Sequence, residues 1–339
     1  MEDHIVVEGG NMKTKQKRRV LLLLTMLFST AVFLSTATYA WFTANRTVSI
    51  SSIQVNVEAQ GGIQVSADGI SWRSIIDVEE LRDIADTYES SVNQIPEVLE
   101  PVSTIGNMNE EGRMEMFYGV VETNTGGNYI LTTTQFEETR NNPNGRFIAF
   151  DLFFRLDGSA PEQLYLTPNS GVSTPDATDT GIKNATRVAF VNLGTTAIGS
   201  STNDIQSLNA GEGASVYIWE PNYNSHTAAA IAHASNTYGL TVDGVSAVPY
   251  SGVHSEITTE DDVLVGDATE ANYSQFFTDV TPDYLTEEDF SDYVPVFNLS
   301  EGITKMRLYL WIEGQDIDTE NTASGGNAIF DIQLTIDPA

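Results

Sequence analysis

Short apolar segments separated by polar, turn-rich stretches make up most of the chain. The apolar segments are rich in β-branched and aromatic residues, which favour strands over helices. Many short strands divided by turn-forming residues are typical of sandwich and jelly-roll folds. The pattern therefore predicts a mostly β fold, a jelly-roll-like antiparallel sandwich. The expected strands cover residues 48–57, 62–66, 70–73, 116–123, 129–135, 146–156, 163–166, 186–193, 214–219, 305–312 and 328–336.

The first of these segments carries a break in its alternation. Val48 and Ile50 are two residues apart, as are Ile53 and Val55, but the step from Ile50 to Ile53 is three residues. Because side chains alternate between the two faces of a strand, this step would turn the second pair to the opposite face. One extra residue in the strand restores the register, so we expect a β-bulge here.

Helical periodicity is scarce. Residues 75–88 place apolar side chains at helical spacing, and the alanine-rich segment 227–234 is long enough for two turns, so we expect one or two short helices. Residues 157–182 and 256–292 are rich in Asp, Glu, Ser, Thr, Gly and Pro and are expected to form long loop insertions. With no internal repeat or interdomain linker in the sequence, residues 41–339 are expected to form a single elaborated β-sandwich domain.

The first 40 residues have the features of a secretory signal. Five basic residues between positions 13 and 19 precede an apolar run over 20–32, and small residues flank Tyr39. A basic region, an apolar core and a small-residue exit predict an N-terminal extension and signal peptide over residues 1–40, removed by a signal peptidase. The alternative is a retained membrane anchor over residues 20–42, which is long enough to cross a bilayer. Both predict an extracellular or cell-surface protein.

Charge and cysteine content narrow the function further. The chain has 16 Lys and Arg against 47 Asp and Glu; five of the basic and three of the acidic residues lie in residues 1–40. The remainder therefore has 11 basic and 44 acidic side chains, a formal charge of −33. Such a surface repels phosphate backbones, which argues against nucleic-acid partners. The absence of cysteine excludes disulfides, Cys-based zinc sites and a Cys nucleophile.

The sequence contains no assembled catalytic motif. Its four histidines are His4, His226, His233 and His254, and neither the zinc-protease spacing nor a Gly-x-Ser-x-Gly elbow is present. We expect His226 and His233 to be surface residues beside the short helix at 227–234. The chain is therefore predicted not to be an enzyme.

One acidic loop has the residue types of a calcium site. Glu313, Asp316, Asp318 and Glu320 follow the apolar segment 305–312 and offer closely spaced carboxylate oxygens. Hard cations such as Ca²⁺ bind oxygen ligands, so these four residues are candidate Ca²⁺ ligands. The alternative is a polar loop whose Asp and Asn side chains form local hydrogen bonds.

Three tryptophans lie in or beside apolar segments. Trp72, Trp219 and Trp311 are expected to pack in the core. A sugar-stacking platform would need them exposed on one face.

Three short phrases resemble a known family. Residues 37–45 read Ala-Thr-Tyr-Ala-Trp-Phe-Thr-Ala-Asn directly after the apolar signal, and residues 217–222 and 311–316 carry Tyr-Ile-Trp-Glu-Pro-Asn and Trp-Ile-Glu-Gly-Gln-Asp. These segments resemble TasA-like and camelysin-like exported proteins of Firmicutes. The resemblance implies a jelly-roll subunit, secreted through a dedicated signal peptidase, that builds fibres or matrix. Camelysin-type proteins carry a protease label, but no metal-binding motif maps onto this chain.

The function expected from these features is that of a secreted or cell-surface structural protein, a subunit of an extracellular fibre or biofilm matrix that self-associates or contacts other surface proteins. A β-prone segment freed by signal removal, residues 47–58, could complete the sheet of the next subunit and give a head-to-tail filament. Alternatively, this segment pairs within its own sheet. The alternative function is an exported adhesin or a carbohydrate- or protein-binding module, and a secreted hydrolase comes third.

Overall fold

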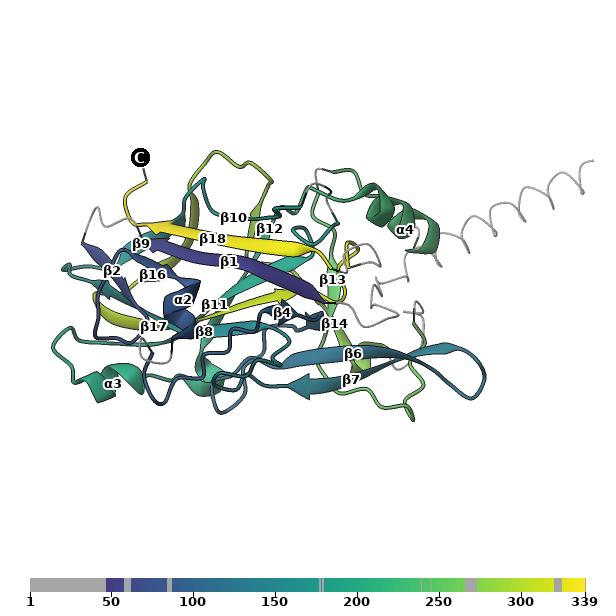
Figure 1. The fold of residues 1–339 in the computed structure, drawn as a ribbon, viewed down its shortest axis with the longest axis horizontal. Helices are drawn as coiled ribbons and strands as arrows, with labels where there is room; N and C mark the ends of the chain where they lie inside the picture. Colours follow the sequence, from purple (N-terminus) through teal and green to yellow (C-terminus); the bar gives the residue numbers. More distant parts are fainter. Residues whose placement is uncertain are drawn as a thin grey trace, which may run out of the picture.

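Two β-sheets packed face to face form the centre of the molecule (Figure 1). The structure is a computed structural model. It describes residues 47–57, 62–83, 87–176, 178, 180–238, 240–244, 246–265, 273–319 and 325–338. The mostly β, sandwich-type fold predicted from the sequence is confirmed.

The first sheet joins the two ends of the described chain. Its strand order is β16-β9-β18-β1-β3, with β10 also paired to β18 and β4 to β1. The first strand β1 and the last strand β18 lie side by side and run parallel (Figure 1). Their ladder shifts register between Ile50 and Ser52, which confirms the predicted bulge. The strands are β1 (Val48–Val57), β3 (Ile75–Asp77), β4 (Val98–Leu99), β9 (Glu162–Leu166), β10 (Gly171–Ser173), β16 (Val294–Leu299) and β18 (Asn327–Thr335).

The second sheet has the order β15-β12-β11-β17-β8-β2. All its pairs are antiparallel except β12 with β15. The sandwich therefore contains two parallel pairs that the antiparallel prediction lacked. The strands are β2 (Ile63–Ser66), β8 (Ile148–Leu156), β11 (Thr186–Thr196), β12 (Ser215–Pro221), β15 (Tyr284–Thr286) and β17 (Gly302–Ile312).

Both faces of the second sheet are buried. Along β17, Leu308 and Leu310 point into the core between the sheets, whereas Tyr309 and Trp311 point into a second apolar cluster on the outer face. That outer face is covered by a third layer of loops and two small sheets. The covering strands are β5 (Val102–Ser103), β6 (Met116–Thr123), β7 (Tyr129–Phe136), β13 (Tyr250–Val253) and β14 (Phe277–Val280).

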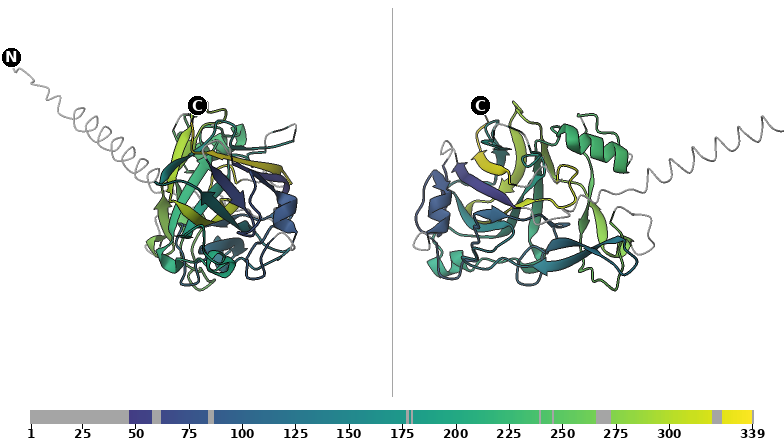
Figure 2. Two further views of the ribbon diagram at one scale, coloured as in Figure 1. Left: turned by 90° about the vertical axis from the view of Figure 1, so that its left-hand side faces the viewer. Right: turned by 45° about the vertical axis from the view of Figure 1, so that its right-hand side comes forward.

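The described residues contain three short α-helices and two 3₁₀ turns. Figure 2 (right) shows α4 and the β6–β7 hairpin at one end of the molecule, with α2 and α3 at the other. The 3₁₀ turns are η1 (Gly211–Gly213) and η2 (Tyr273–Gln275). The α-helices are α2 (Val78–Arg82), α3 (Thr202–Gln206) and α4 (Ala228–Tyr238).

Three expectations about local structure were wrong. Residues 75–77 form β3, and the helix expected over 75–88 begins only after Asp77, whose carboxylate accepts hydrogen bonds from the N–H groups of Glu79 and Glu80 in a capping box. Residues 70–73 form no strand, because the Asp68 carboxylate binds the first two N–H groups of that segment and holds a turn. The expected loop insertion at 256–292 contributes strands β14 and β15.

Candidate functional site

Strand β1 occupies a slot inside the first sheet. It lies between β18 on one side and β3 and β4 on the other. Val48, Ile53 and Val55 are at most 1% exposed, and Ile50 is 8% exposed. The segment that the sequence analysis singled out for assembly therefore pairs within its own sheet in the single chain, which was the alternative reading.

The start of the slot is closed by backbone hydrogen bonds from separate parts of the chain. Gly325 N donates to Thr47 O at 2.8 Å, Ser49 N to Gly326 O at 2.9 Å, and Ile50 N to Glu97 O at 2.9 Å. On the side of β3 and β4, residues 51–53 have no ladder partner among the described residues, because β4 pairs only with positions 48–49 and β3 with 54–56. This edge of β1 is therefore only partly covered.

The structure brings three of the four predicted Ca²⁺ ligands into one buried cluster, together with Arg187 from β11. Glu313 accepts hydrogen bonds from Trp311 Nε1 and from the backbone N–H of Gln315, both at 3.0 Å. Asp316 forms a 2.6 Å ion pair with Arg187. Asp318 forms a 2.6 Å contact with the Nδ1 atom of His226. The fourth candidate, Glu320, lies outside the described residues.

Negative charge is in excess in this cluster. Arg187 also pairs with Glu220 at 3.0 Å, so one guanidinium is shared by two carboxylates. Burial outweighs that pairing and raises the pKa of Glu220 to about 7, and burial also raises the pKa of Glu313 to about 7.

The carboxylates already have partners within the protein. Over the ranges that the structure describes, no three His, Asp or Glu side chains are arranged to hold a metal ion. Calcium binding at this loop stays a prediction, because one of its four residues is outside those ranges.

His226 is not the surface residue that the sequence predicted. Its side chain is 4% exposed. Burial lowers its pKa, but the hydrogen bond to Asp318 and the neighbouring carboxylates outweigh this and raise the pKa overall. Asp318 also accepts from the N–H of Thr227, and the Thr227 hydroxyl accepts from the N–H of Ala230 in the first turn of α4. The pair thus fastens α4 to the loop after β17, a contact that sequence spacing could not show because 92 positions separate the two residues.

A second buried polar cluster lies on the outer face of the second sheet. Arg307 on β17 donates from Nε to Asp151 Oδ1 on β8 at 2.7 Å, and its Nη1 contacts Glu138 Oε1 at 3.1 Å. Lys305 Nζ lies 3.3 Å from Asp151 Oδ2, and the Tyr309 hydroxyl donates to Glu138 at 2.8 Å. Burial alone would raise the pKa of Asp151, but Arg307 and Lys305 hold it well below its usual range. The only sequence signal was charged residues inside two apolar segments.

The tryptophans of β12 and β17 are core residues, as predicted. Trp219 and Trp311 are fully buried and Trp72 is half-buried. They form no exposed aromatic platform. The exposed aromatic of note is Tyr129, 64% exposed at the start of β7, and the partner strand β6 carries Val120, which is 40% exposed.

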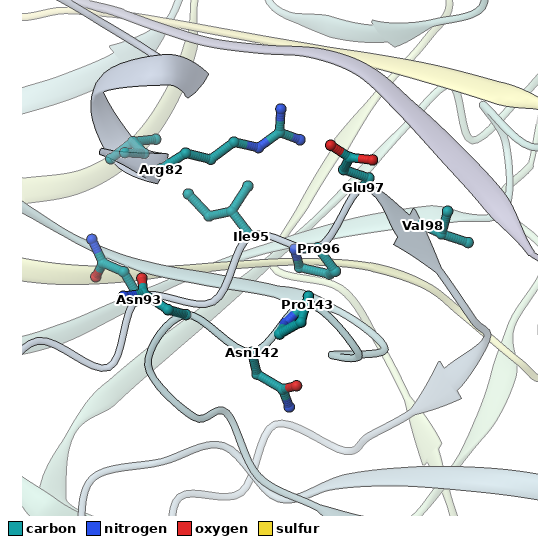
Figure 3. Close-up of a pocket in the computed structure, with 10 residues that line it drawn as sticks. Arg82, Asn93, Ile95, Pro96, Glu97, Val98, Asn142 and Pro143 are labelled. Carbon is teal, nitrogen blue, oxygen red and sulfur yellow. The ribbon is translucent and has the colours of Figure 1, made fainter. Parts of the chain in front are cut away.

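A surface cleft of about 390 Å³ lies between the end of α2 and the loop at 141–143. Figure 3 shows Arg82 and Glu97 extending toward one another over Ile95, with Pro96 and Pro143 beside it. Asn93, Asn141 and Asn142 complete the polar lining, and Leu81 and Val98 the apolar lining. This cleft leaves no motif in the sequence, because its walls come from three separate segments.

Comparison of the chain with protein-family models, with curated proteins and with solved structures finds no match in any of the three. The resemblance to TasA-like and camelysin-like proteins therefore stays a prediction. Within the described ranges, no helix is both long and apolar enough to cross a membrane. The predicted signal or anchor segment lies outside those ranges.

Proposed function

We propose that this protein is a secreted or cell-surface structural protein, a non-enzymatic subunit of an extracellular fibre or biofilm matrix that assembles through its N-terminal strand. The observation that carries the proposal is the position of β1. It is the first strand of the described chain, it fills an interior slot of the first sheet, and its next neighbour in sequence, β2, belongs to the other sheet.

Exchange of β1 between subunits would preserve most of its contacts. A β1 strand from a second copy would offer the same apolar side chains and the same backbone groups to β18, β3 and β4. The contact energy would therefore be nearly the same whether a chain keeps its own β1 or receives β1 from another copy. Exchange would then depend on the segment that links β1 to β2 and on protein concentration.

The hinge is short and the contact is directional. Residues 58–61 link β1 to Gly62. Each extended residue spans about 3.3–3.6 Å, so a donated β1 must enter a subunit that lies directly alongside. If each subunit gives its strand to one neighbour and receives a strand from another, the contact is head-to-tail, and its repetition without closure into a ring produces a filament.

The absence of cysteine makes a direct test available. Gln54 and Asp331 are partners in the β1–β18 ladder. Neighbouring strands lie about 4.7–4.9 Å apart, within the Cα separation of about 4.4–6.8 Å that a disulfide needs. We would prepare residues 41–339 with Gln54→Cys and Asp331→Cys, oxidise the protein under assembly conditions and separate it on a denaturing, non-reducing gel.

A ladder of covalent multimers that collapses on reduction is the expected result, together with filaments in electron microscopy. Covalent monomers alone, from a sample in which the disulfide has formed, would refute strand exchange. The matched control pairs Gln54→Cys with Ile329→Cys. Ile329 is the partner of Ser52, so this pair is two positions out of register and should cross-link poorly.

A second candidate function is an exported adhesin or binding module. It is favoured by the β6–β7 hairpin, which projects from the body (Figure 1) and carries the exposed Tyr129 and Val120. This function predicts dispersed monomers and loss of partner binding in Tyr129→Ala, whereas filament assembly should not depend on this residue.

A further inference from the structure

The cleft beside α2 is rigidly built. Asn141 N donates to Asn93 O at 2.9 Å, and Asn142 N donates to Thr139 O at 3.0 Å, which fixes the loop at 141–143. Gln94 locks the opposite wall: its amide Nε2 donates to Phe147 O at 2.9 Å and its Oε1 accepts from Thr139 N at 3.1 Å. A site whose walls are held before binding loses little conformational entropy when a ligand arrives.

Two charged side chains, those of Arg82 and Glu97, stand at the mouth of the cleft. Within the described ranges, the side chains of Arg82 and Glu97 form no hydrogen bond or ion pair, although they face one another in Figure 3. The cleft therefore offers the guanidinium donors of Arg82 and the carboxylate acceptor of Glu97 next to an apolar floor.

The lining selects the charge and shape of a ligand. One arginine and one glutamate leave the cleft without net charge, so an anion would meet Glu97 and a cation would meet Arg82. A purely apolar ligand would desolvate both charged groups without pairing them. The volume of about 390 Å³ falls within the range of small-molecule sites, about 300–1,000 Å³.

We propose that this cleft binds a neutral sugar. A pyranose ring has hydroxyl groups that both donate and accept, and it has an apolar C–H face. Arg82 would donate to ring hydroxyl oxygens, and Glu97 would accept from hydroxyl hydrogens on the opposite side. Ile95, Pro96 and Pro143 would pack against the C–H face of the ring. The proposal does not rest on strand exchange, because the lining side chains come from α2, the segment 93–98 and the loop at 141–143 and none comes from β1, although the backbone of Glu97 and β4 pairs with β1.

The test is saturation-transfer NMR of residues 41–339 with three neutral disaccharides: maltose, cellobiose and N,N′-diacetylchitobiose. At least one is expected to bind saturably in the millimolar range or tighter. Arg82→Ala and Glu97→Ala are each expected to weaken that binding about tenfold, the effect of losing one charge-assisted hydrogen bond. Both side chains are exposed, so both variants should keep the melting temperature of the parent protein.

Matched controls remove the same charges elsewhere. Arg155→Ala, on β8, and Glu301→Ala, in the turn before β17, lie outside the cleft and should leave sugar binding unchanged. Binding by none of the three disaccharides would overturn the proposal. Binding that Arg82→Ala and Glu97→Ala leave intact would overturn it as well, because the sugar would then occupy another place.

Discussion

Removal of β1 should take away most of the folding free energy of the single chain. Four apolar side chains of β1, those of Val48, Ile50, Ile53 and Val55, lie in the core between the sheets. Burying a side chain of this kind is worth about 1.5–3 kcal/mol, so the four together contribute about 6–12 kcal/mol. The whole stability of a typical domain is about 5–15 kcal/mol. A chain that starts at Gly62 should therefore be largely unfolded or molten.

A synthetic peptide of residues 47–57 should restore the fold, because it supplies the same side chains and backbone partners. Thermal unfolding would be followed by circular dichroism for residues 62–339 with increasing peptide, and residues 41–339 would provide the reference. The melting temperature should rise with peptide concentration by mass action. A control peptide carrying Ile53→Asp should fail, because it would bury an unpaired carboxylate in the core.

A full-length variant keeps this reasoning testable if the truncated chain aggregates. Ile53→Ala should cost about 2–5 kcal/mol in urea unfolding, while Gln54→Ala, exposed on the next position, should change stability by less than about 0.5 kcal/mol. Cooperative melting of residues 62–339 within a few degrees of the longer chain would contradict this prediction. That result would mean that the rest of the chain folds stably without β1.

The remaining predictions concern the buried charges. Arg307→Met should lower the free energy of unfolding by about 3–5 kcal/mol in urea, because it leaves the Asp151 carboxylate buried beside a single lysine. Stability should fall as pH rises from about 4.5 to 7, because Glu220 keeps its proton in the folded state up to about 7, and Glu220→Gln should flatten this fall in thermal melts. Millimolar Ca²⁺ should leave the melting temperature unchanged, because Asp316 would have to leave Arg187; a rise removed by Asp316→Asn would instead support the predicted calcium loop.

The long strands could be predicted from the sequence because their pattern is strong by itself. Residues 305–312 alternate between aliphatic side chains and larger polar or aromatic ones, and this segment became β17. The period-2 pattern predicts a strand, but it does not reveal that both faces are buried. Burial of the second face depends on β5, β13 and β14, which come from distant parts of the chain.

The short strands could not be predicted from the sequence, because these segments become strands only by pairing with a neighbouring strand. β4 and β5 have two residues each, and β3 and β15 have three. Such segments gain strand structure from the neighbour they pair with, not from their own propensity. The same is true of the parallel pairing of β1 with β18, which joins residues about 280 positions apart in sequence. Long-range pairing of this kind leaves no local trace.

The candidate sites were likewise only partly visible in the sequence. The acidic residues Glu313, Asp316 and Asp318 were visible in the sequence as a cluster, but their partners Arg187 and His226 were not. The sequence shows only a carboxylate cluster of the kind that binds cations, and the structure adds the ion pair of Asp316 with Arg187 and the contact of Asp318 with His226. The cleft beside α2 left no motif, since its lining comes from three segments of ordinary composition.

The two buried polar clusters suggest how a chain without disulfides fixes its third layer. An apolar layer packed on an apolar sheet face can slide, because hydrophobic contact has little directional preference. The pairs Arg187–Asp316 and Arg307–Glu138 tie strands of the second sheet to the loops that cover its outer face, since a shift of either would leave a charge buried and unpaired. On this hypothesis the clusters select one arrangement of the layers and add little net stability. The slot of β1 contains no such pair among its buried side chains, which are all aliphatic. A strand held only by aliphatic packing and backbone hydrogen bonds can be replaced by an identical strand from another copy without breaking any ion pair.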